Sequence, residues 1–135
     1  MAILAEISIG EFLDKMTILE IKSDRILDAV PLANVRRELE GLRAAWARSP
    51  FAAHDISQDL AELRTVNEKL WTIEDRLREM EAARSFNQEF IDLARAVYLT
   101  NDERAEIKRR LNLRLGSSLI EEKSHPDYKS PWRPG

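Results

Sequence analysis

Charged side chains that interrupt apolar helical stripes are the residues of this sequence best suited to chemistry. Asp14 and Arg25 flank two isoleucines on one stripe of an N-terminal helix. Trp71 and Asp75 share a stripe of a later helix, and Arg104 belongs to another. If these stripes meet, they form a mixed-charge groove with an aromatic wall, which suits a nucleotide or a sugar phosphate. The candidate ligand-binding residues are Asp14, Lys15, Glu20, Lys22, Trp71, Asp75, Asn101, Asp102, Arg104 and Lys108.

A second interpretation of the same residues is structural. Charged side chains between helices also form salt-bridge networks, and half-buried ion pairs of this kind often fix the packing register. Asp75, for example, lies three residues before Arg78 and can pair with it on the same helix.

Motifs for catalysis and metal binding are poorly represented. The chain has no cysteine, and its two histidines, His54 and His125, fall in a predicted loop and in the tail. No glycine-rich phosphate loop occurs. Glu74 and Asp75, with acids of the first helix, form a candidate metal site, but such carboxylates usually form a solvated face. We therefore expect no catalytic residue, no metal and no other cofactor.

The charge balance argues against nucleic acid as a partner. The formal net charge is −3, from 21 basic and 24 acidic residues. A basic stretch from Arg104 to Arg114 is diluted by neighbouring acids, whereas binding to phosphate backbones needs an excess of positive charge. No apolar run is long enough to span a membrane, and the first residues do not form a signal peptide. We expect a cytoplasmic protein.

Hydrophobic periodicity predicts an all-α fold. Strong helix formers dominate the 135 residues, and only four glycines and five prolines occur. Ser8 and Glu11 form a capping box that starts the first helix. We expect an antiparallel bundle of four to five helices, which cover about 8–28, 32–48, 57–83, 85–99 and 100–115. The close join at 99–100 implies either a sharp turn or a kinked continuation.

The segment 57–83 is predicted to be one long central helix. Apolar residues recur from Leu60 to Met80 with heptad-like spacing. At about 1.5 Å per residue the helix is roughly 40 Å long, which one chain of this size covers with difficulty. Either a helix hairpin or a second copy of the chain lies along it. We expect a homodimer with coiled-coil packing.

The two ends of the chain differ from the rest. Ile3, Ala5 and Ile7 alternate with other residues, which predicts a short N-terminal strand, with residues 118–120 as its candidate partner. Residues 121–135 contain three of the five prolines and are expected to form an extended tail. The predicted organisation is one helical domain, 1–120, followed by that tail.

Several stretches carry a family resemblance. They are EISIGEFLDKMTILEIK at 6–22, FIDLARAVY at 90–98, TNDER at 100–104 and LIEEKS at 119–124. On these motifs the chain resembles a small bacterial family, family 6165 of the domains of unknown function. The resemblance implies no established activity, and it implies a context near glycosyltransferases and other cell-surface polysaccharide genes. The pattern that it implies includes Asp14, Lys15, Glu20, Lys22, residues 101–104 and residues 121–124.

Together these observations favour a non-catalytic helical interaction or accessory module that forms a homodimer. The resemblance links this module to cell-surface polysaccharide or glycosyltransferase pathways. The alternative is a small-molecule binding protein or enzyme that uses the mixed-charge groove between helices for a nucleotide or a sugar phosphate.

Overall fold

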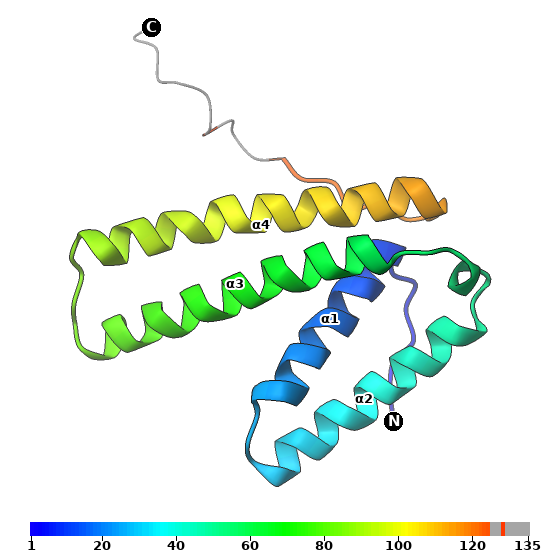
Figure 1. Ribbon diagram of the computed structural model, residues 1–135, viewed down its shortest axis with the longest axis horizontal. Helices are drawn as coiled ribbons and strands as arrows, with labels where there is room; N and C mark the ends of the chain where they lie inside the picture. The colour runs from blue at the N-terminus through cyan, green and yellow to red at the C-terminus, as the bar shows by residue number, and fades with distance from the viewer. Residues whose placement is uncertain (125–127, 129–135) are drawn as a thin grey trace, which may run out of the picture.

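All regular structure in the described part of the chain is helical. The structure, a computed structural model, describes residues 1–124 and Tyr128. The elements are α1 (Ile9–Arg25), α2 (Ala29–Arg48), a short 3-10 helix η1 (Pro50–Ala53), α3 (Ser57–Ala82) and α4 (Gln88–Leu115). α1 and α2 form one hairpin, and α3 and α4 form a longer one that crosses it steeply (Figure 1). The predicted all-α class is confirmed.

α1 is the helix at the centre of the packing. It lies against α2, α3 and α4, whereas α2 packs on α1 and η1. Leu13, Leu19 and Ile21 are buried on different sides of α1, since its apolar residues cover more than one face. The prediction that the 57–83 helix is the central one is therefore corrected: α3 is long, but α1 joins the two hairpins.

The ends of α1 and α2 follow from local chemistry. Ser8 is the N-cap of α1, and its hydroxyl accepts a hydrogen bond from the backbone N–H of Glu11 at 3.1 Å, as the capping motif predicts. α1 ends at Arg25 rather than near 28, and α2 begins at Ala29 rather than after Pro31. Proline fits the first turn of α2 because the backbone N–H that it lacks would have no partner there.

α4 replaces two predicted helices. The join at 99–100, for which a sharp turn or a kinked continuation is predicted, lies within one helix, because the segment 88–115 contains no glycine or proline and Thr100 is fully buried. The N-cap is Asn87, not Ser85, and its side chain accepts from the N–H of Phe90 at 3.1 Å. Gly116, at φ 70°, ends α4 as predicted. α4 runs along α3, so a hairpin of the same chain covers the long helix (Figure 1).

The predicted N-terminal strand is wrong. No strand occurs in residues 1–124, and Ile3 and Leu4 are each 95% exposed. Residues 118–120, the expected partner, also lie outside any strand. Two short isolated segments cannot form a stable sheet alone. Residues 116–124 follow α4 without a helix, and the Pro-rich remainder, 125–127 and 129–135, lies outside the described residues. The division into a 1–120 domain and a 121–135 tail stays a prediction.

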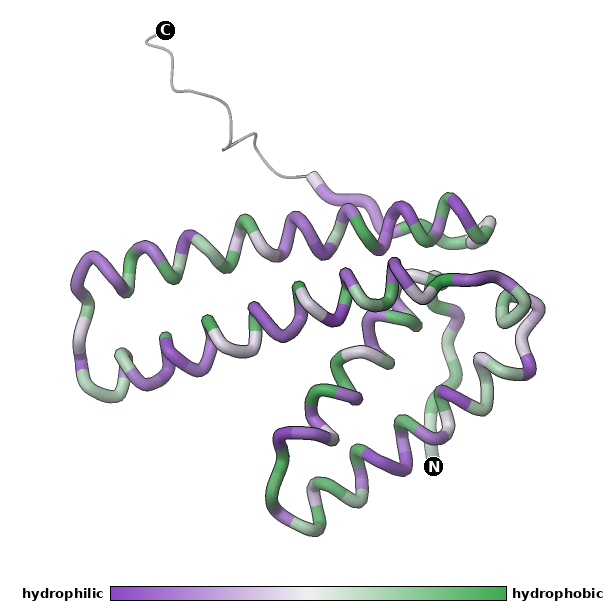
Figure 2. The backbone as a smooth tube through the Cα atoms, viewed as in Figure 1, coloured by the Kyte–Doolittle hydropathy of each residue, from purple (hydrophilic) through white to green (hydrophobic). Residues whose placement is uncertain are grey.

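The core is built where α1, α3 and α4 meet. Leu13, Leu63 and Leu111 contribute one fully buried side chain from each of these helices. Apolar residues recur along each helix between polar ones, as amphipathic helices require (Figure 2). α1 and α4 approach very closely at Gly10, where an added Cβ would lie 2.5 Å from the carbonyl oxygen of Lys108. This close contact fixes where the polar side chains of the two helices meet.

Candidate functional site

A buried polar network joins α1 to α3. The side-chain nitrogen of Asn67 donates to Asp14 Oδ1 and to Thr17 Oγ1, each at 2.8 Å. Thr17 donates in turn to the backbone carbonyl of Asp14 at 2.8 Å. All three residues are buried, at 4%, 2% and 5% exposure for Asp14, Thr17 and Asn67. Because buried polar groups need partners, this network fixes the register of the two helices.

Lys108 extends the network to α4 and to the segment that follows it. Its ammonium lies 2.5 Å from Glu11, 3.0 Å from Glu121 and 3.9 Å from Asp14. Burial by itself lowers the pKa of Lys108, but the bonds from Glu11 and Glu121 and the charge of Asp14 outweigh it and raise this pKa. The same bond to Lys108 lowers the pKa of Glu121. Lys108 is therefore a charged, buried anchor.

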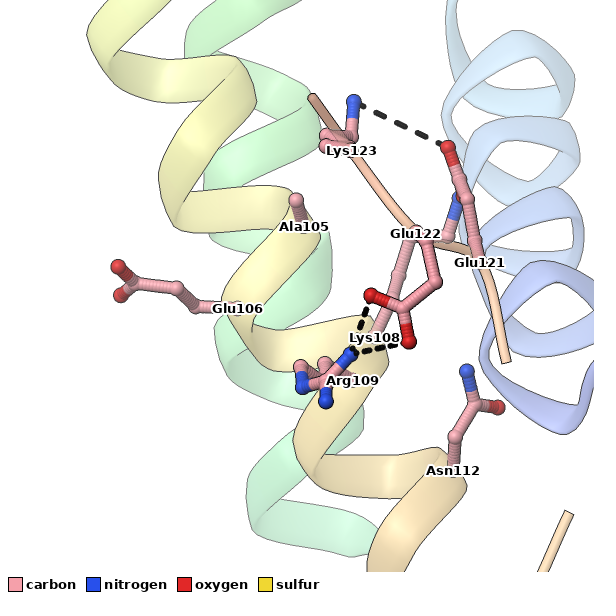
Figure 3. A pocket seen from close by; sticks show the side chains of 8 residues that line it. All are labelled: Ala105, Glu106, Lys108, Arg109, Asn112, Glu121, Glu122 and Lys123. Atoms are coloured by element: carbon pink, nitrogen blue, oxygen red, sulfur yellow. Dashed lines mark hydrogen bonds and ion pairs between the residues drawn. The ribbon is translucent and has the colours of Figure 1, made fainter. Parts of the chain in front are cut away.

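A shallow pocket lies beside this anchor, between α4 and residues 121–123. It measures about 210 Å³. Figure 3 shows the Glu122 carboxylate beside Arg109 of α4, at 3.1 Å, and Glu121 beside Lys123, at 3.8 Å. Three carboxylates and three cationic side chains line the pocket. Since these charges largely pair with one another, the pocket looks like packing of the C-terminal segment on α4.

A larger groove lies on the other side of the buried network, where α1 diverges from the second hairpin. Its volume is about 370 Å³, within the range of small-ligand sites of roughly 300–1,000 Å³. Ile21, Asn67 and Leu70 are buried at its floor, and Ile18 and Trp71 are half-buried. The remaining lining residues are Lys22, Glu74, Arg78 and Arg104.

The groove collects cationic side chains from three helices. Lys22 comes from α1, Arg78 from α3 and Arg104 from α4, against one carboxylate, Glu74. Within residues 1–124 and 128, neither Lys22 nor Arg104 forms an ion pair, and Arg78 pairs with Asp75 at 3.5 Å. The Trp71 ring has a further cation nearby, since the Arg25 guanidinium lies 5.8 Å from its centroid. The groove is therefore lined by more cationic than carboxylate side chains, beside an aromatic and aliphatic wall.

Three of the predicted site residues line this groove and two lie in the buried network. Lys22, Trp71 and Arg104 share the groove, whereas Asp14 and Lys108 are buried beside it. The polar stripes of α1, α3 and α4 thus meet, as predicted. Their residues fall into two layers, the groove and the buried network beside it.

The other predicted site residues lie outside the groove and are exposed or half-buried. Lys15 pairs with Glu38 of α2 at 3.0 Å, and Glu20 with Arg64 at 3.0 Å. Asp75 is exposed and lies outside the groove, with Arg78 as its partner. These contacts match the structural interpretation of the charges. Asn101 and Asp102 are half-buried on α4, and Asp102 accepts a hydrogen bond from the hydroxyl of Tyr128.

Sequence reasoning missed several residues of this region. Glu11 was assigned to a helix cap, and it also binds Lys108. Asn112, which accepts the N–H of Gly10 at 2.6 Å, gave no signal beyond its polar type in an apolar stripe. Arg78 and Asn67 share the sequence stripe of Trp71 and Asp75 and line the groove, although neither is among the predicted site residues. Only the arrangement of three helices in space reveals these roles.

The described residues hold neither a cluster suited to a metal ion nor a helix suited to a membrane. Over residues 1–124 and 128, no three His, Asp or Glu side chains are placed to share a metal ion. The acids near the candidate metal site have other partners, since Glu20 and Glu68 both bind Arg64 and Asp75 pairs with Arg78. No helix in this part of the chain has the length and hydropathy to cross a membrane.

Comparison with known proteins gives a family and no activity. The model of a family of unknown function, DUF6165, matches residues 3–133. No curated protein and no solved structure matches the chain. Because the match spans nearly the whole sequence, the chain belongs to this family.

Proposed function

We propose that this chain, as a member of a family of unknown function, binds a small anionic molecule in the groove between α1, α3 and α4. The ligand class is a nucleotide or a sugar phosphate. The observation that carries the proposal is the convergence of Lys22, Arg78 and Arg104 from three helices on one groove of about 370 Å³.

Other cationic side chains of the protein bind carboxylates directly, which sets the cations of the groove apart. Arg64 binds Glu20, Asp24 and Glu68, and Arg110 and Arg114 both bind Asp59. Lys22 and Arg104, by contrast, form no direct ion pair in the described residues, although the charge of Arg104 contributes to the lowered pKa of Glu121. Grouped like charges destabilise a fold unless something offsets their repulsion, and functional sites are where such costs persist. A bound phosphate group would supply the missing negative charge.

The test is a calorimetric titration of the full chain with adenosine 5′-monophosphate and with glucose 6-phosphate. We expect at least one of them to bind. Arg104→Gln should weaken binding about ten-fold or more, because a charge-assisted hydrogen bond contributes about 1.5–3 kcal/mol. Arg95→Gln is the matched control, since Arg95 is exposed on the same helix and does not line the groove. Absence of binding at millimolar concentration, or equal loss in both variants, contradicts the proposal.

The accessory module is a second candidate, and exposed apolar side chains favour it. Ile3, Leu4, Ile91 and Leu99 are all exposed. In this candidate the chain forms a coiled-coil homodimer in the bacterial cytoplasm and serves a cell-surface polysaccharide or glycosyltransferase pathway, a link that rests on the sequence resemblance. Sedimentation at micromolar concentration tests it: a dimer supports this candidate, and a strict monomer that binds no phosphate ester contradicts both candidates.

A further inference from the structure

The orientation of the Asn67 amide is chemically determined. Asp14 accepts hydrogen bonds through its carboxylate and, when ionised, has none to donate. The group that faces Asp14 Oδ1 at 2.8 Å must therefore be the amide nitrogen of Asn67. The second hydrogen of this nitrogen goes to Thr17 Oγ1, also at 2.8 Å. The nitrogen is then saturated, and the carbonyl oxygen is the polar atom of Asn67 that is left over.

No hydrogen bond to this oxygen occurs within residues 1–124 and 128, and the oxygen is open to solvent, since Thr100 Oγ1 is the fully buried side-chain atom that lacks a partner in this part of the chain. Asn67 lines the floor of the cationic groove, next to Ile21 and Leu70. The amide of Asn67 is held in place by the buried Asp14, and the other polar groups of the groove are mostly cations. This oxygen therefore suits a ligand that replaces the water on it with a hydrogen-bond donor.

We propose that the ligand is a monophosphorylated sugar or polyol, with its phosphate on Lys22, Arg78 and Arg104 and a hydroxyl group donating to Asn67 Oδ1. This inference rests on the proposed function and specifies its ligand. A carboxylate would occupy one guanidinium, whereas the three terminal oxygens of a phosphate monoester suit cations that arrive from three helices. The carbon skeleton would lie on Ile18 and Trp71, which form the apolar wall.

The size of the groove favours a small ligand within this class. A volume of about 370 Å³ is near the lower end of the range for small-molecule sites, roughly 300–1,000 Å³. The groove therefore suits one sugar and one phosphate better than a nucleotide with an added base.

The experiment compares ligands rather than variants of Asn67, because replacing Asn67 would leave Asp14 buried without its amide donor. The full chain is titrated calorimetrically with glucose 6-phosphate and with cyclohexylmethyl phosphate, which keeps the ring and the phosphate and lacks the hydroxyl groups. We expect the sugar phosphate to bind about ten-fold tighter or more, because the analogue would displace water from the Asn67 oxygen without replacing its hydrogen bond. Arg104→Gln should weaken both esters and leave their ratio unchanged.

The possible titration results test the role of Asn67, the ligand class and the groove itself separately. Equal affinity for the two esters overturns the role of Asn67 and leaves the anion-binding groove standing. Tighter binding of adenosine 5′-monophosphate than of glucose 6-phosphate overturns the choice of a sugar or polyol within the proposed function. Absence of binding by all three compounds overturns the proposed function together with this inference.

Discussion

At the scale of single residues, the clearest feature is the close approach of α1 and α4 at Gly10. The backbone N–H of Gly10 donates to Asn112 Oδ1 at 2.6 Å. A Cβ at this position would lie 2.5 Å from the carbonyl oxygen of Lys108, which belongs to the helix backbone and cannot rotate away. Glycine is therefore required here by the distance between two helices, and the positions of Lys108 and Asp14 depend on it.

Gly10→Ala should destabilise the protein by about 1–3 kcal/mol, because the helices must separate to admit the methyl group. The measurement is the free energy of unfolding from urea denaturation. Gly41→Ala is the matched control: Gly41 lies in α2, and an added Cβ would meet nothing within 4 Å. That variant should be stabilised by about 0.5–1 kcal/mol through helix propensity. Equal effects of the two substitutions would contradict the close contact.

At the scale of elements, the segment after α4 is attached by charge. Glu121 binds the buried Lys108 at 3.0 Å, and Glu122 binds the exposed Arg109 at 3.1 Å. Tyr128 donates to Asp102, a bond that raises the pKa of Tyr128 to about 12. These contacts lie along α4, so the segment returns over the helix that it follows.

The attachment through Glu121 should depend on pH. Because its pKa is lowered from 4.5 in the folded protein, Glu121 stabilises the fold above pH 4.5, and this contribution is lost as the pH falls through the folded value. The raised pKa of Lys108 preserves its charge throughout this range. Glu121→Gln should cost about 1 kcal/mol at pH 7, since Glu121 is nearly half exposed, and less at pH 3.

Denaturation midpoints at the two pH values provide the measurement. Glu122→Gln serves as the control, because both members of its ion pair are exposed and it should change stability by at most a few tenths of a kcal/mol at either pH. A pH-independent loss in Glu121→Gln would show that its side chain acts by packing rather than by charge.

The elements also show how far the sequence could predict the fold. Periodicity and caps located α3 and the start of α1, because Ser8 and the apolar repeat act locally. The predicted boundary at 99–100 lies inside α4, where Thr100 is completely buried and the helix continues. The Pro31 boundary failed because proline also fits a first turn.

At the scale of the whole molecule, two helix hairpins cross, and α1 joins them. This arrangement places Lys22, Trp71 and Arg104 in one groove and buries Asp14 and Lys108 beneath it. The sequence predicted a polar surface where three helical stripes meet, because each stripe is visible in one dimension. Which of these residues line the groove and which are buried could not be predicted from the sequence. That division depends on how the hairpins cross and on the contact at Gly10.

The most direct test of the account follows the indole N–H signals of Trp71 and Trp46 in a nitrogen–proton spectrum during titration with glucose 6-phosphate. Trp71→Phe assigns the first signal. Trp46 is the internal control, because its ring lies 6.1 Å from Phe12 and 6.3 Å from Phe51, away from the groove lining. We predict a saturable shift of the Trp71 signal with an unchanged Trp46 signal. A Trp71 signal that stays fixed up to millimolar ligand, or both signals moving together, would contradict a binding site in this groove.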